Sequence, residues 1–392
     1  MTRPTHAQPK TVVVLGSTGS VGTQTLDVLR TMGACARVVG LSGGSRWESL
    51  AAQVREFRPD VVSVADEADA GRLADAVDGC GAEVLWGPEG LWSLACWDGA
   101  DVVVSAVSGA AGLPAAVAAL EAGKVLALAN KEAMVMFGPA LMRLADEAGG
   151  AILPVDSEHS ALFQLLRGIP VDEIDRIVLT ASGGPFRGMS RDELARVTPE
   201  EALRHPTWQM GRKITVDSAT LVNKALEIIE ARWLFGLPAD RIGVLIHPQS
   251  IVHCLVELVD GSVLAHMGAP DMRLPIQYAL SYPARVAGPA PRLDLSRLGS
   301  LEFHEPDLEA FPALALGYRA AREGGTSGAV LSAANEEAVC AFLEGRVDLP
   351  GIVDVVAEVM NRHTVQPDAG LEAVMAADRW AREEARHCLH RP

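Results

Sequence analysis

Short valine-rich runs alternate with longer alanine- and leucine-rich stretches between Thr11 and Val155. Several of these longer stretches, Val21–Met32, Trp47–Phe57 and Leu113–Ala122, have the apolar periodicity of helices. Continuous apolar strands separated by helices are typical of a parallel sheet that is covered on both faces. The first part of the chain is therefore predicted to be a doubly wound, Rossmann-like α/β domain. The predicted strands are Thr11–Leu15, Arg37–Leu41, Val61–Val64, Asp101–Ser105, Val125–Ala129 and Ala151–Val155.

The pattern changes after the sixth of these strands. Strand-like runs at Arg176–Ala181 and Ile242–Ile246 flank a long Pro- and Gly-containing segment, and a hairpin is predicted around Asp260–Gly261. Four helical stretches follow the Pro-rich segment Pro283–Pro291, at 307–323, 329–344, 351–363 and 370–388. We therefore expect a disordered tail, a doubly wound α/β domain, an α+β domain with a flexible loop, and a C-terminal helical bundle. The predicted bounds are 1–10, 11–153, 154–292 and 293–392.

Composition limits the classes of partner. The 392 residues include 34 Lys and Arg against 50 Asp and Glu, a formal charge of −16. Nucleic acids and anionic membranes require a basic face, so neither is expected as a partner, whereas a small anionic ligand needs only a local pocket. The first ten residues lack the apolar core of a signal peptide, and no long uninterrupted apolar stretch follows. A cytoplasmic enzyme is the expectation.

A glycine-rich segment, Gly16-Ser-Thr-Gly19-Ser-Val-Gly22, follows the first predicted strand and opens a helix. Glycines allow a tight turn and close approach of the backbone to a pyrophosphate, and the helix N-terminus offers it free N–H groups. A dinucleotide site is predicted on this strand–turn–helix context, although the spacing differs from the commoner G-x-G-x-x-G. The alternative is a glycine-rich turn without a ligand. The predicted cofactor residues here are Gly16, Ser17, Thr18, Gly19, Ser20 and Val21.

The end of the second strand favours NADP over NAD. It reads Leu41-Ser-Gly-Gly-Ser-Arg46, without a carboxylate to bind a ribose 2′-hydroxyl. Gly43, Gly44 and Ser45 are assigned to the cofactor, and Ser45 and Arg46 are able to donate to a 2′-phosphate. The alternative is that Arg46 is a solvated charge at the start of a helix.

Two groups of carboxylates indicate a metal site. Asp156 and Glu158 follow the last strand of the predicted sheet, where doubly wound folds place ligands. Glu227 shares a predicted helix face with Asn223 and Lys224, at i,i+4 and i,i+3 spacing. Three carboxylates without clustered His or Cys suggest Mg²⁺ or Mn²⁺. The alternatives are a helix cap at Asp156 and an ordinary Lys224–Glu227 surface pair.

Hydroxyl and ammonium groups near these carboxylates suggest an anion pocket. Ser218 or Thr220 is expected at the start of the helix that carries Asn223 and Lys224, where the first N–H groups have no acceptor within the helix and can bind an anion. Ser182 follows another predicted strand. The remaining candidates are Lys131 at a strand end, and the loop from His205 to Trp208, which is expected to cover a ligand rather than fill a core. His247 and His253 are expected to be structural histidines.

The assembled motifs resemble one enzyme family along 11–380. They are Gly16–Gly22, Leu128-Ala-Asn-Lys-Glu132, Leu153-Pro-Val-Asp-Ser-Glu-His159, Ala181-Ser-Gly-Gly-Pro-Phe186, His205-Pro-Thr-Trp208, Val216-Asp-Ser-Ala-Thr220, Asn223-Lys-Ala-Leu-Glu227, His247-Pro-Gln-Ser250 and Ala334-Asn-Glu336. Their order is similar to that of the 1-deoxy-D-xylulose 5-phosphate reductoisomerases. The resemblance implies formation of 2-C-methyl-D-erythritol 4-phosphate in the non-mevalonate isoprenoid pathway, by retro-aldol cleavage, re-addition and hydride transfer from NADPH.

The same resemblance implies roles for individual residues and a homodimer. The metal, Mn²⁺ or Mg²⁺ with Co²⁺ as a further candidate, would be held by Asp156, Glu158 and Glu227. Substrate would be bound by Lys131, Ser157, Glu158, Ser182, His205, Trp208, Ser218, Asn223, Lys224 and Glu227, with Trp208 on the lid. Asn130, Glu132 and Gly211 would join the glycine loop at NADPH. The expected catalytic residues are Lys131, Asp156, Glu158 and Glu227. The candidates for proton transfer are Lys131 and a metal-bound water.

This chain departs from the family pattern in two places. The family commonly has Gly where Ala225 stands, and a basic–Asn pair near Gly44–Ser45, for which Arg46 is the substitute in this chain. Two other functions remain open from the residues alone. One is an NADP-dependent dehydrogenase of the semialdehyde or homoserine type, and the other is a non-catalytic NADP-binding regulator. Neither needs three metal-binding carboxylates.

Overall fold

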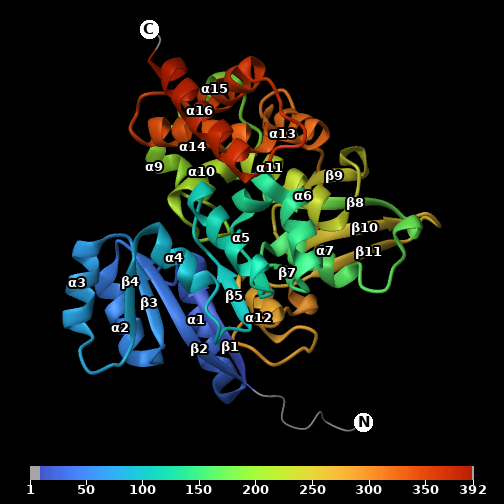
Figure 1. Cartoon of the computed structure of the whole chain (residues 1–392). Coiled ribbons are helices and arrows are strands. Elements are labelled where there is room, and N and C mark those ends of the chain that lie inside the picture. Colours follow the sequence, from blue (N-terminus) through green and yellow to red (C-terminus); the bar gives the residue numbers. More distant parts are fainter. Residues whose placement is uncertain (1–8, 391–392) are drawn as a thin grey trace. The chain divides into compact units, whose positions relative to one another are not determined.

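The computed structural model describes residues 9–390, so the predicted tail over 1–10 lies largely outside the described residues, and Lys10 already belongs to the first strand. The chain forms two compact units, each assembled from separate stretches of sequence (Figure 1). Unit 1 comprises 1–130, 141–156 and 272–290, and unit 2 comprises 131–140, 157–271 and 291–392. The predicted limits of 11–153, 154–292 and 293–392 stay a prediction, because compactness alone does not define a domain that folds by itself.

Unit 1 is built on a parallel sheet. Within the described residues it has seven strands in the order β4-β3-β2-β1-β5-β6-β7. All neighbouring pairs are parallel, and Val12 to Leu15 in the central strand are completely buried, as expected for a sheet covered on both faces. The strands are β1 Lys10–Leu15, β2 Ala36–Gly44, β3 Val61–Val64, β4 Glu83–Trp86, β5 Val102–Ser105, β6 Val125–Leu128 and β7 Ala151–Pro154.

The helices of unit 1 follow from the strand order. Because parallel crossovers are right-handed, the helices after β1, β2 and β3 lie on one face, and those after β4 and β5 lie on the other. The contacts agree, since α2 packs on α3 and α4 packs on α5, while α12 joins the sheet from a distant stretch of sequence and packs on α1. The bounds are α1 Ser20–Met32, α2 Trp47–Phe57, α3 Glu67–Ala76, α4 Gly87–Ala95, α5 Leu113–Glu121 and α12 Arg273–Ser281.

Helix α6, Lys131–Ala148, takes part in both units. Its first ten residues belong to unit 2 and the rest to unit 1. The helix is interrupted at Phe137, where φ is −140° and ψ is 23°, two residues before Pro139. Proline lacks the N–H that would continue the helical ladder, which accounts for the break at this point.

Unit 2 contains a smaller mixed sheet in the order β11-β10-β8-β9 within the described residues. Strand β10 is antiparallel to β8 and β11, whereas β8 and β9 are parallel. The β10–β11 turn lies at the predicted Asp260–Gly261, where Gly261 has a φ of +85° and Asp260 accepts the Ser262 N–H at 2.8 Å. The strands are β8 Ile174–Ala181, β9 Ile242–Ile246, β10 Val252–Leu258 and β11 Val263–Met267.

Helices make up the rest of unit 2. The predicted C-terminal bundle is formed by α13 to α16, in which α14 packs against α13, α15 and α16. The segment between β8 and β9 is largely helical and carries most of the predicted substrate residues. The bounds are α7 Ser157–Leu165, α8 Arg191–Leu194, α9 Pro199–Ala202, α10 Arg212–Ala219, α11 Val222–Phe235, α13 Ala313–Glu323, α14 Ser327–Leu343, α15 Leu349–Arg362 and α16 Leu371–Leu389.

The predicted fold class is confirmed: a doubly wound parallel sheet, a mixed α+β part and a helical C-terminal part are all present. Strand β4 was not predicted, because Glu83–Trp86 is short and none of its four residues is buried. Among residues 9–390, no helix has the length and apolar character needed to cross a membrane.

Candidate active site

The predicted dinucleotide loop is a tight turn between β1 and α1 in which glycine is required twice. Gly16 has a φ of +80°, and a Cβ there would lie 2.6 Å from the carbonyl oxygen of Ala106. A Cβ on Gly22 would lie 2.2 Å from the carbonyl oxygen of Gly16. The loop and the first turn of α1 are therefore packed so closely that positions 16 and 22 have no room for a side chain. The first N–H groups of α1, at Ser20 and Val21, have no acceptor within the helix and are suited to an anion.

Two hydroxyls of this loop fasten it to β2. Ser17 Oγ is fully buried and bonds Gln53 Oε1 at 2.6 Å and the carbonyl oxygen of Ser42 at 3.0 Å. Thr18 Oγ1 donates to the carbonyl oxygen of Gly43 at 3.0 Å. These predicted cofactor residues therefore hold the shape of the loop with their side chains. Gln53, whose amide also donates to the Ser17 carbonyl, is a supporting residue that the sequence motif did not reveal.

Arg46 reaches back to the glycine loop. It is exposed at the start of α2, and its Nη2 lies 3.8 Å from the Cβ position of Gly19. Gly43 and Gly44 end β2 and Ser45 lies in the turn that follows it, with Gly44 at a φ of +56°. A guanidinium beside the dinucleotide loop, with no carboxylate at the strand end, suits a ribose 2′-phosphate.

Asn130 occupies the end of the β6 region with a buried side chain. Its Nδ2 donates to the carbonyl oxygens of Val107 and Gly109, the latter at 2.9 Å, and so holds the turn after β5. The amide of this predicted cofactor residue therefore shapes the turn next to the glycine loop in unit 1. The other two, Glu132 and Gly211, lie in unit 2.

A break between α10 and α11 determines where the predicted phosphate residues lie. Leu221 has a φ of 59°, a left-handed conformation that is uncommon for a non-glycine residue, and it ends α10 and starts α11. The prediction that Ser218 or Thr220 starts the helix of Asn223 and Lys224 is therefore wrong. Ser218 lies in the last turn of α10 and Thr220 is its C-cap, because the backbone turns at Leu221.

The first turns of α11 carry a buried charge cluster. Lys131 Nζ, at the start of α6, lies 2.7 Å from Asn223 Oδ1 and 3.2 Å from Glu227 Oε1. Lys224 Nζ bonds the other oxygen of Glu227 and lies 3.0 Å from Glu158 Oε1. Glu227 is 1% exposed, so its carboxylate is held between two ammonium groups in a region of low dielectric. The spacing that predicted Asn223, Lys224 and Glu227 on one helix face is confirmed.

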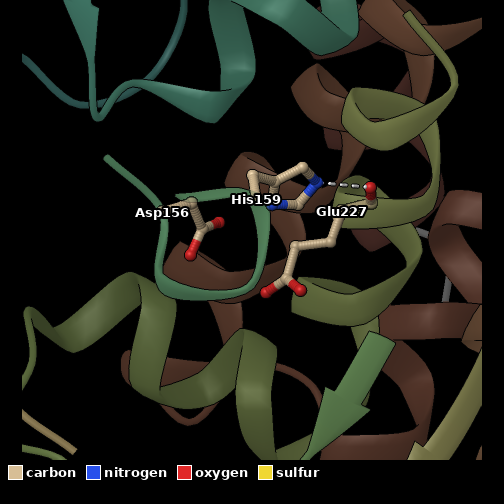
Figure 2. A group of neighbouring side chains, drawn as sticks. All are labelled: Asp156, His159 and Glu227. Carbon is tan, nitrogen blue, oxygen red and sulfur yellow. Dashed lines mark hydrogen bonds between the residues drawn. The ribbon is translucent and has the colours of Figure 1, made fainter. Parts of the chain in front are cut away.

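The predicted metal ligands lie next to this cluster. Asp156 is the residue before α7, and one ligand atom each from Asp156, His159 and Glu227 lies within 4.8 Å of the others (Figure 2). Glu158 is outside this group, since its carboxylate bonds Lys224 and accepts the Ser157 hydroxyl at 2.6 Å. Clustered, largely buried carboxylates whose charge is balanced by Lys131 and Lys224 form a hard donor set that fits a divalent cation.

His159 is a member of this group, and it also orients the helix that carries Glu227. Its Nε2 lies 2.9 Å from the backbone carbonyl oxygen of Glu227, and a carbonyl oxygen only accepts, so Nε2 carries the proton (Figure 2). Its Nδ1 faces Glu230 Oε2 at 3.7 Å, and both side chains are fully buried. The ring therefore holds α7 against the turn of α11 that presents Glu227.

A second polar cluster brings Ser182, His205 and Ser218 together. His205 Nε2 lies 3.0 Å from Ser182 Oγ and 3.1 Å from Ser218 Oγ, and its Nδ1 accepts the backbone N–H groups of Thr207 and Trp208. Burial lowers the pKa of His205 below its ordinary value, which favours this neutral tautomer. Three hydrogen-bonding side chains that point at one another around a glycine turn, with Gly184 N–H donating to Ser182 Oγ, suit a phosphate.

Lys213 is a site-associated residue that the motifs did not indicate. Its Nζ lies 2.8 Å from Glu132 Oε1 and 3.0 Å from Asp217 Oδ2. Burial alone would lower the pKa of Lys213, but Asp217 and Glu132 raise it above its ordinary value. Burial would raise the pKa of Glu132, and Lys213 lowers it overall. The i,i+4 spacing of Lys213 and Asp217 on one helix was the available sequence signal.

His253, predicted to be structural, is 4% exposed on β10 and lies 6.4 Å from the Trp208 ring, centroid to centroid. Burial, with a smaller contribution from Lys224, lowers its pKa to about 4. The unfolded chain therefore binds a proton near pH 6.5 that the folded protein takes up only near pH 4. The contribution of His253 to the free energy of unfolding is fully present above pH 6.5. It is lost as the pH falls from about 6.5 to about 4, which lowers the free energy of unfolding by about 3 kcal/mol.

His253→Gln is accordingly expected to make thermal unfolding less sensitive to acid. The difference in Tm between about pH 7 and about pH 5 should be smaller in the variant than in the unsubstituted protein, since one proton-linked group has been removed. Circular dichroism melts at both pH values measure this. An equal difference in both proteins would show that His253 titrates normally in the folded state.

Family models and known proteins match this chain over most of its length. The family model described as 1-deoxy-D-xylulose 5-phosphate reductoisomerase matches residues 12–138. A second family model, described as the 1-deoxy-D-xylulose 5-phosphate reductoisomerase C-terminal domain, matches residues 152–235. A third, described as the DXP reductoisomerase C-terminal domain, matches residues 267–384. A 1-deoxy-D-xylulose 5-phosphate reductoisomerase from Chlorobium phaeobacteroides is 51% identical over 96% of this chain and 99% of its own. The chain belongs to this reductoisomerase family.

Further relatives agree with the family. The reductoisomerase of Prosthecochloris aestuarii is 52% identical over 96% of this chain and 98% of its own. A solved DOX-P reductoisomerase in complex with NADPH, fosmidomycin and magnesium has a TM-score of 0.91 and 39% identity, covering 97% of this chain and 98% of that one. The Zymomonas mobilis enzyme in complex with NADPH has a TM-score of 0.91 and 41% identity, covering 98% of this chain and all of that one. The predicted family is confirmed, and the dehydrogenase and regulator alternatives are not favoured.

Proposed function

We propose that this chain converts 1-deoxy-D-xylulose 5-phosphate into 2-C-methyl-D-erythritol 4-phosphate, using NADPH and a divalent metal ion. The observation that carries the proposal is the buried cluster of Lys131, Asn223, Lys224 and Glu227, within the same unit as the Ser182–His205–Ser218 cluster. The first cluster supplies charged groups for carbonyl chemistry, and the second supplies neutral donors for a phosphate. A simple dehydrogenase would need neither the carboxylates nor two anion-binding clusters.

The carboxylates are assigned to the metal, Mn²⁺ or Mg²⁺. Asp156, Glu158 and Glu227 would hold it, with the Glu158 carboxylate exchanging its bond with Lys224 for the ion. When bound, the ion polarises the ketone of the substrate and lowers the pKa of the neighbouring hydroxyl. His159 keeps the Glu227 turn in place through the backbone carbonyl, and Lys224 is left as a cation for the substrate phosphate.

The phosphate of the substrate is assigned to Ser182, Ser218, Asn223 and Lys224, with Ser157 nearby on α7. His205 donates through Nε2, and its Nδ1 ties the ring to the backbone of the segment that carries Trp208. An anion that binds between the two serines therefore also fixes this segment, and Trp208 is expected to cover the substrate. Binding energy from the remote phosphate then contributes to orientation of the reacting carbons.

Lys131 is assigned to the reacting end of the substrate. Lys131 is 6% exposed, and its ammonium is already directed by Asn223 Oδ1 and Glu227 Oε1. Little side-chain entropy is therefore lost when substrate oxygens replace one of these partners. The charge stabilises oxygen anions that develop during carbon–carbon bond cleavage and hydride transfer. NADPH is assigned to the Gly16–Val21 loop with Arg46, Asn130, Glu132 and Gly211.

We also propose that the protein acts in the cytoplasm as a homodimer, and that neither nucleic acid nor a membrane is a partner. The net charge of −16 supports the second part, since it disfavours polyanionic surfaces while leaving local pockets of Ser, Asn and Lys for a small phosphate. The family resemblance supports the dimer.

Removal of metal ions is expected to stop the reaction. Protein treated with a chelator should oxidise NADPH in the presence of 1-deoxy-D-xylulose 5-phosphate at least about a hundredfold more slowly, because the ion contributes several kcal/mol to the barrier. Addition of Mn²⁺ or Mg²⁺ should restore the rate. Absorbance of NADPH measures both rates, and full turnover by chelated protein would favour the dehydrogenase alternative instead.

Arg46→Ala is expected to weaken the discrimination between NADPH and NADH. Loss of a charge-assisted hydrogen bond to a phosphate should raise the KM for NADPH by about tenfold or more, while turnover with NADH should change little. Arg72→Ala, an exposed arginine on α3 of the same unit, is the matched control. If both cofactors were affected equally, Arg46 would not be the 2′-phosphate contact.

A further inference from the structure

A chain of polar groups, all buried except the half-buried Lys213, connects the C-terminal bundle to α10 and α6. Asn335 Nδ2 on α14 donates to Asp217 Oδ1 on α10 at 2.7 Å. The other oxygen of Asp217 faces Lys213 Nζ at 3.0 Å, and Lys213 also bonds Glu132 Oε1 on α6 at 2.8 Å. Asn335 is fully buried and Asp217 is 1% exposed. These four side chains join three helices. Glu132 and Lys213 are 81 residues apart in the sequence, and Asp217 and Asn335 are 118 residues apart.

The bundle end of this chain is itself held by charges. Glu336, next to Asn335, bonds Arg382 on α16 at 2.6 Å, and Arg382 makes two bonds with Asp378 at 2.9 and 3.0 Å. Burial raises the pKa of Glu336, although Lys213 and Arg382 oppose the shift. Asn335 Oδ1 has no hydrogen-bond partner among the described residues. A buried amide oxygen without a hydrogen-bond partner destabilises the folded protein. We therefore ascribe the presence of Asn335 to the hydrogen bond that its Nδ2 donates to Asp217.

The site end of the chain lies beside two residues of the proposed active site, and its last member, Glu132, is one of the residues assigned to NADPH. Asp217 directly precedes Ser218, which faces His205, and Glu132 directly follows Lys131. The left-handed Leu221 joins α10 to the turn that carries Asn223 and Lys224. The position of α10 therefore affects the phosphate donors on both sides of Leu221.

We propose that Asn335 is a positioning residue through which the C-terminal bundle fixes α10, and with it Ser218, for binding of the substrate phosphate. The inference rests on the proposed function for the identity of the ligand. It gives a role to the Ala334-Asn-Glu336 motif and to the C-terminal helices, none of which contributes a side chain to the clusters of the site within the described residues. Asn335 acts through Asp217 and does not touch the substrate.

Asn335→Ala is the first test. It is expected to raise the KM for 1-deoxy-D-xylulose 5-phosphate by about tenfold, since a buried hydrogen bond to a charged group is lost at α10. The KM for NADPH should change less than the KM for the substrate, because Glu132, which is assigned to NADPH, keeps its own bond with Lys213. A residue that served only general stability would lower the amount of active protein and leave both KM values unchanged.

The exchanged pair supplies the rescue. Asn335→Asp alone places two carboxylates opposite each other, and Asp217→Asn alone removes the charge that faces Lys213. The double variant Asp217→Asn with Asn335→Asp restores one amide donor, one carboxylate acceptor and the net charge. Its KM for the substrate is expected to be closer to that of the unsubstituted protein than either single variant's. A double variant with the sum of both defects would overturn the proposal.

Hydrogen exchange of the full-length protein keeps this test separate from the proposed function. Asn335→Ala should speed amide exchange in α10, Arg212–Ala219, more than Phe342→Leu does. Phe342 lies two turns further along α14 in the core, and its side chain cannot donate a hydrogen bond to Asp217. Equal exchange of α10 in the two variants would overturn the positioning role. Absence of turnover in the unsubstituted protein would count against the proposed function alone.

Discussion

Glu227→Gln is expected to lower kcat by about a thousandfold or more, because a metal ligand worth several kcal/mol to the barrier is lost. The amide keeps the size of the side chain but removes the negative charge that lies between Lys131 and Lys224. Lys131 and Lys224 then lose the carboxylate that lies between them, which further disfavours the arrival of a divalent cation. Titration with Mn²⁺ should show weaker binding, while binding of NADPH, followed by fluorescence, should persist.

The matched control for this variant is Glu257→Gln. Glu257 lies on β10 of the same unit and pairs with Arg176 at a part-exposed position. A surface pair of this kind contributes little, so turnover is expected to stay within about twofold. If Glu227→Gln behaved like Glu257→Gln, the assignment of the metal site would be wrong, and the cluster on α11 would have to be explained as a structural ion pair.

Lys131→Met is expected to lower kcat by roughly a hundredfold to ten-thousandfold, the range of a positioned catalytic group. Methionine retains the apolar stem in its buried position but has no ammonium to stabilise the developing oxygen anion. The effect on the metal should be the opposite of that of Glu227→Gln. Removing the ammonium at 3.2 Å from Glu227 Oε1 leaves the negative charge of that carboxylate less compensated, so Mn²⁺ should bind at least as tightly as in the unsubstituted protein.

Together the two variants separate chemistry from metal binding. Glu227→Gln loses both turnover and affinity for Mn²⁺, whereas Lys131→Met loses turnover alone. Lys124→Met is the control for the second variant, since Lys124 precedes β6 and its Nζ only reaches the carbonyl oxygen of Asp98 at 3.3 Å. Weaker binding of Mn²⁺ by Lys131→Met would show that Lys131 supports the cluster structurally.

The sequence predicted the parts of this protein that depend on neighbours in the chain. Buried valines in β1 and the glycines at 16 and 22 follow from the period of strands and the packing of a tight turn, both of which are local. The same is true of Asn223, Lys224 and Glu227, whose spacing alone places them on one face of α11. Motif similarity added roles that spacing left open.

Features that depend on distant contacts were not predicted. The helix that was expected to begin at Ser218 or Thr220 begins at Val222, because Leu221 adopts a left-handed backbone that its residue type does not suggest. Lys213 was overlooked since its partner Glu132 is 81 residues away. Helix α12 packs on α1 across more than two hundred residues of sequence, and no local pattern indicates such a pairing.

The division of the chain into two units has a consequence for protein engineering. Boundaries between compact units are usually the places that tolerate inserted tags or new chain ends. Here two of the boundaries fall between Asn130 and Lys131 and between Asp156 and Ser157, inside the proposed machinery. Insertions at these joints should therefore inactivate the protein, and exposed turns such as the one at Gly261 are the better sites for fusion.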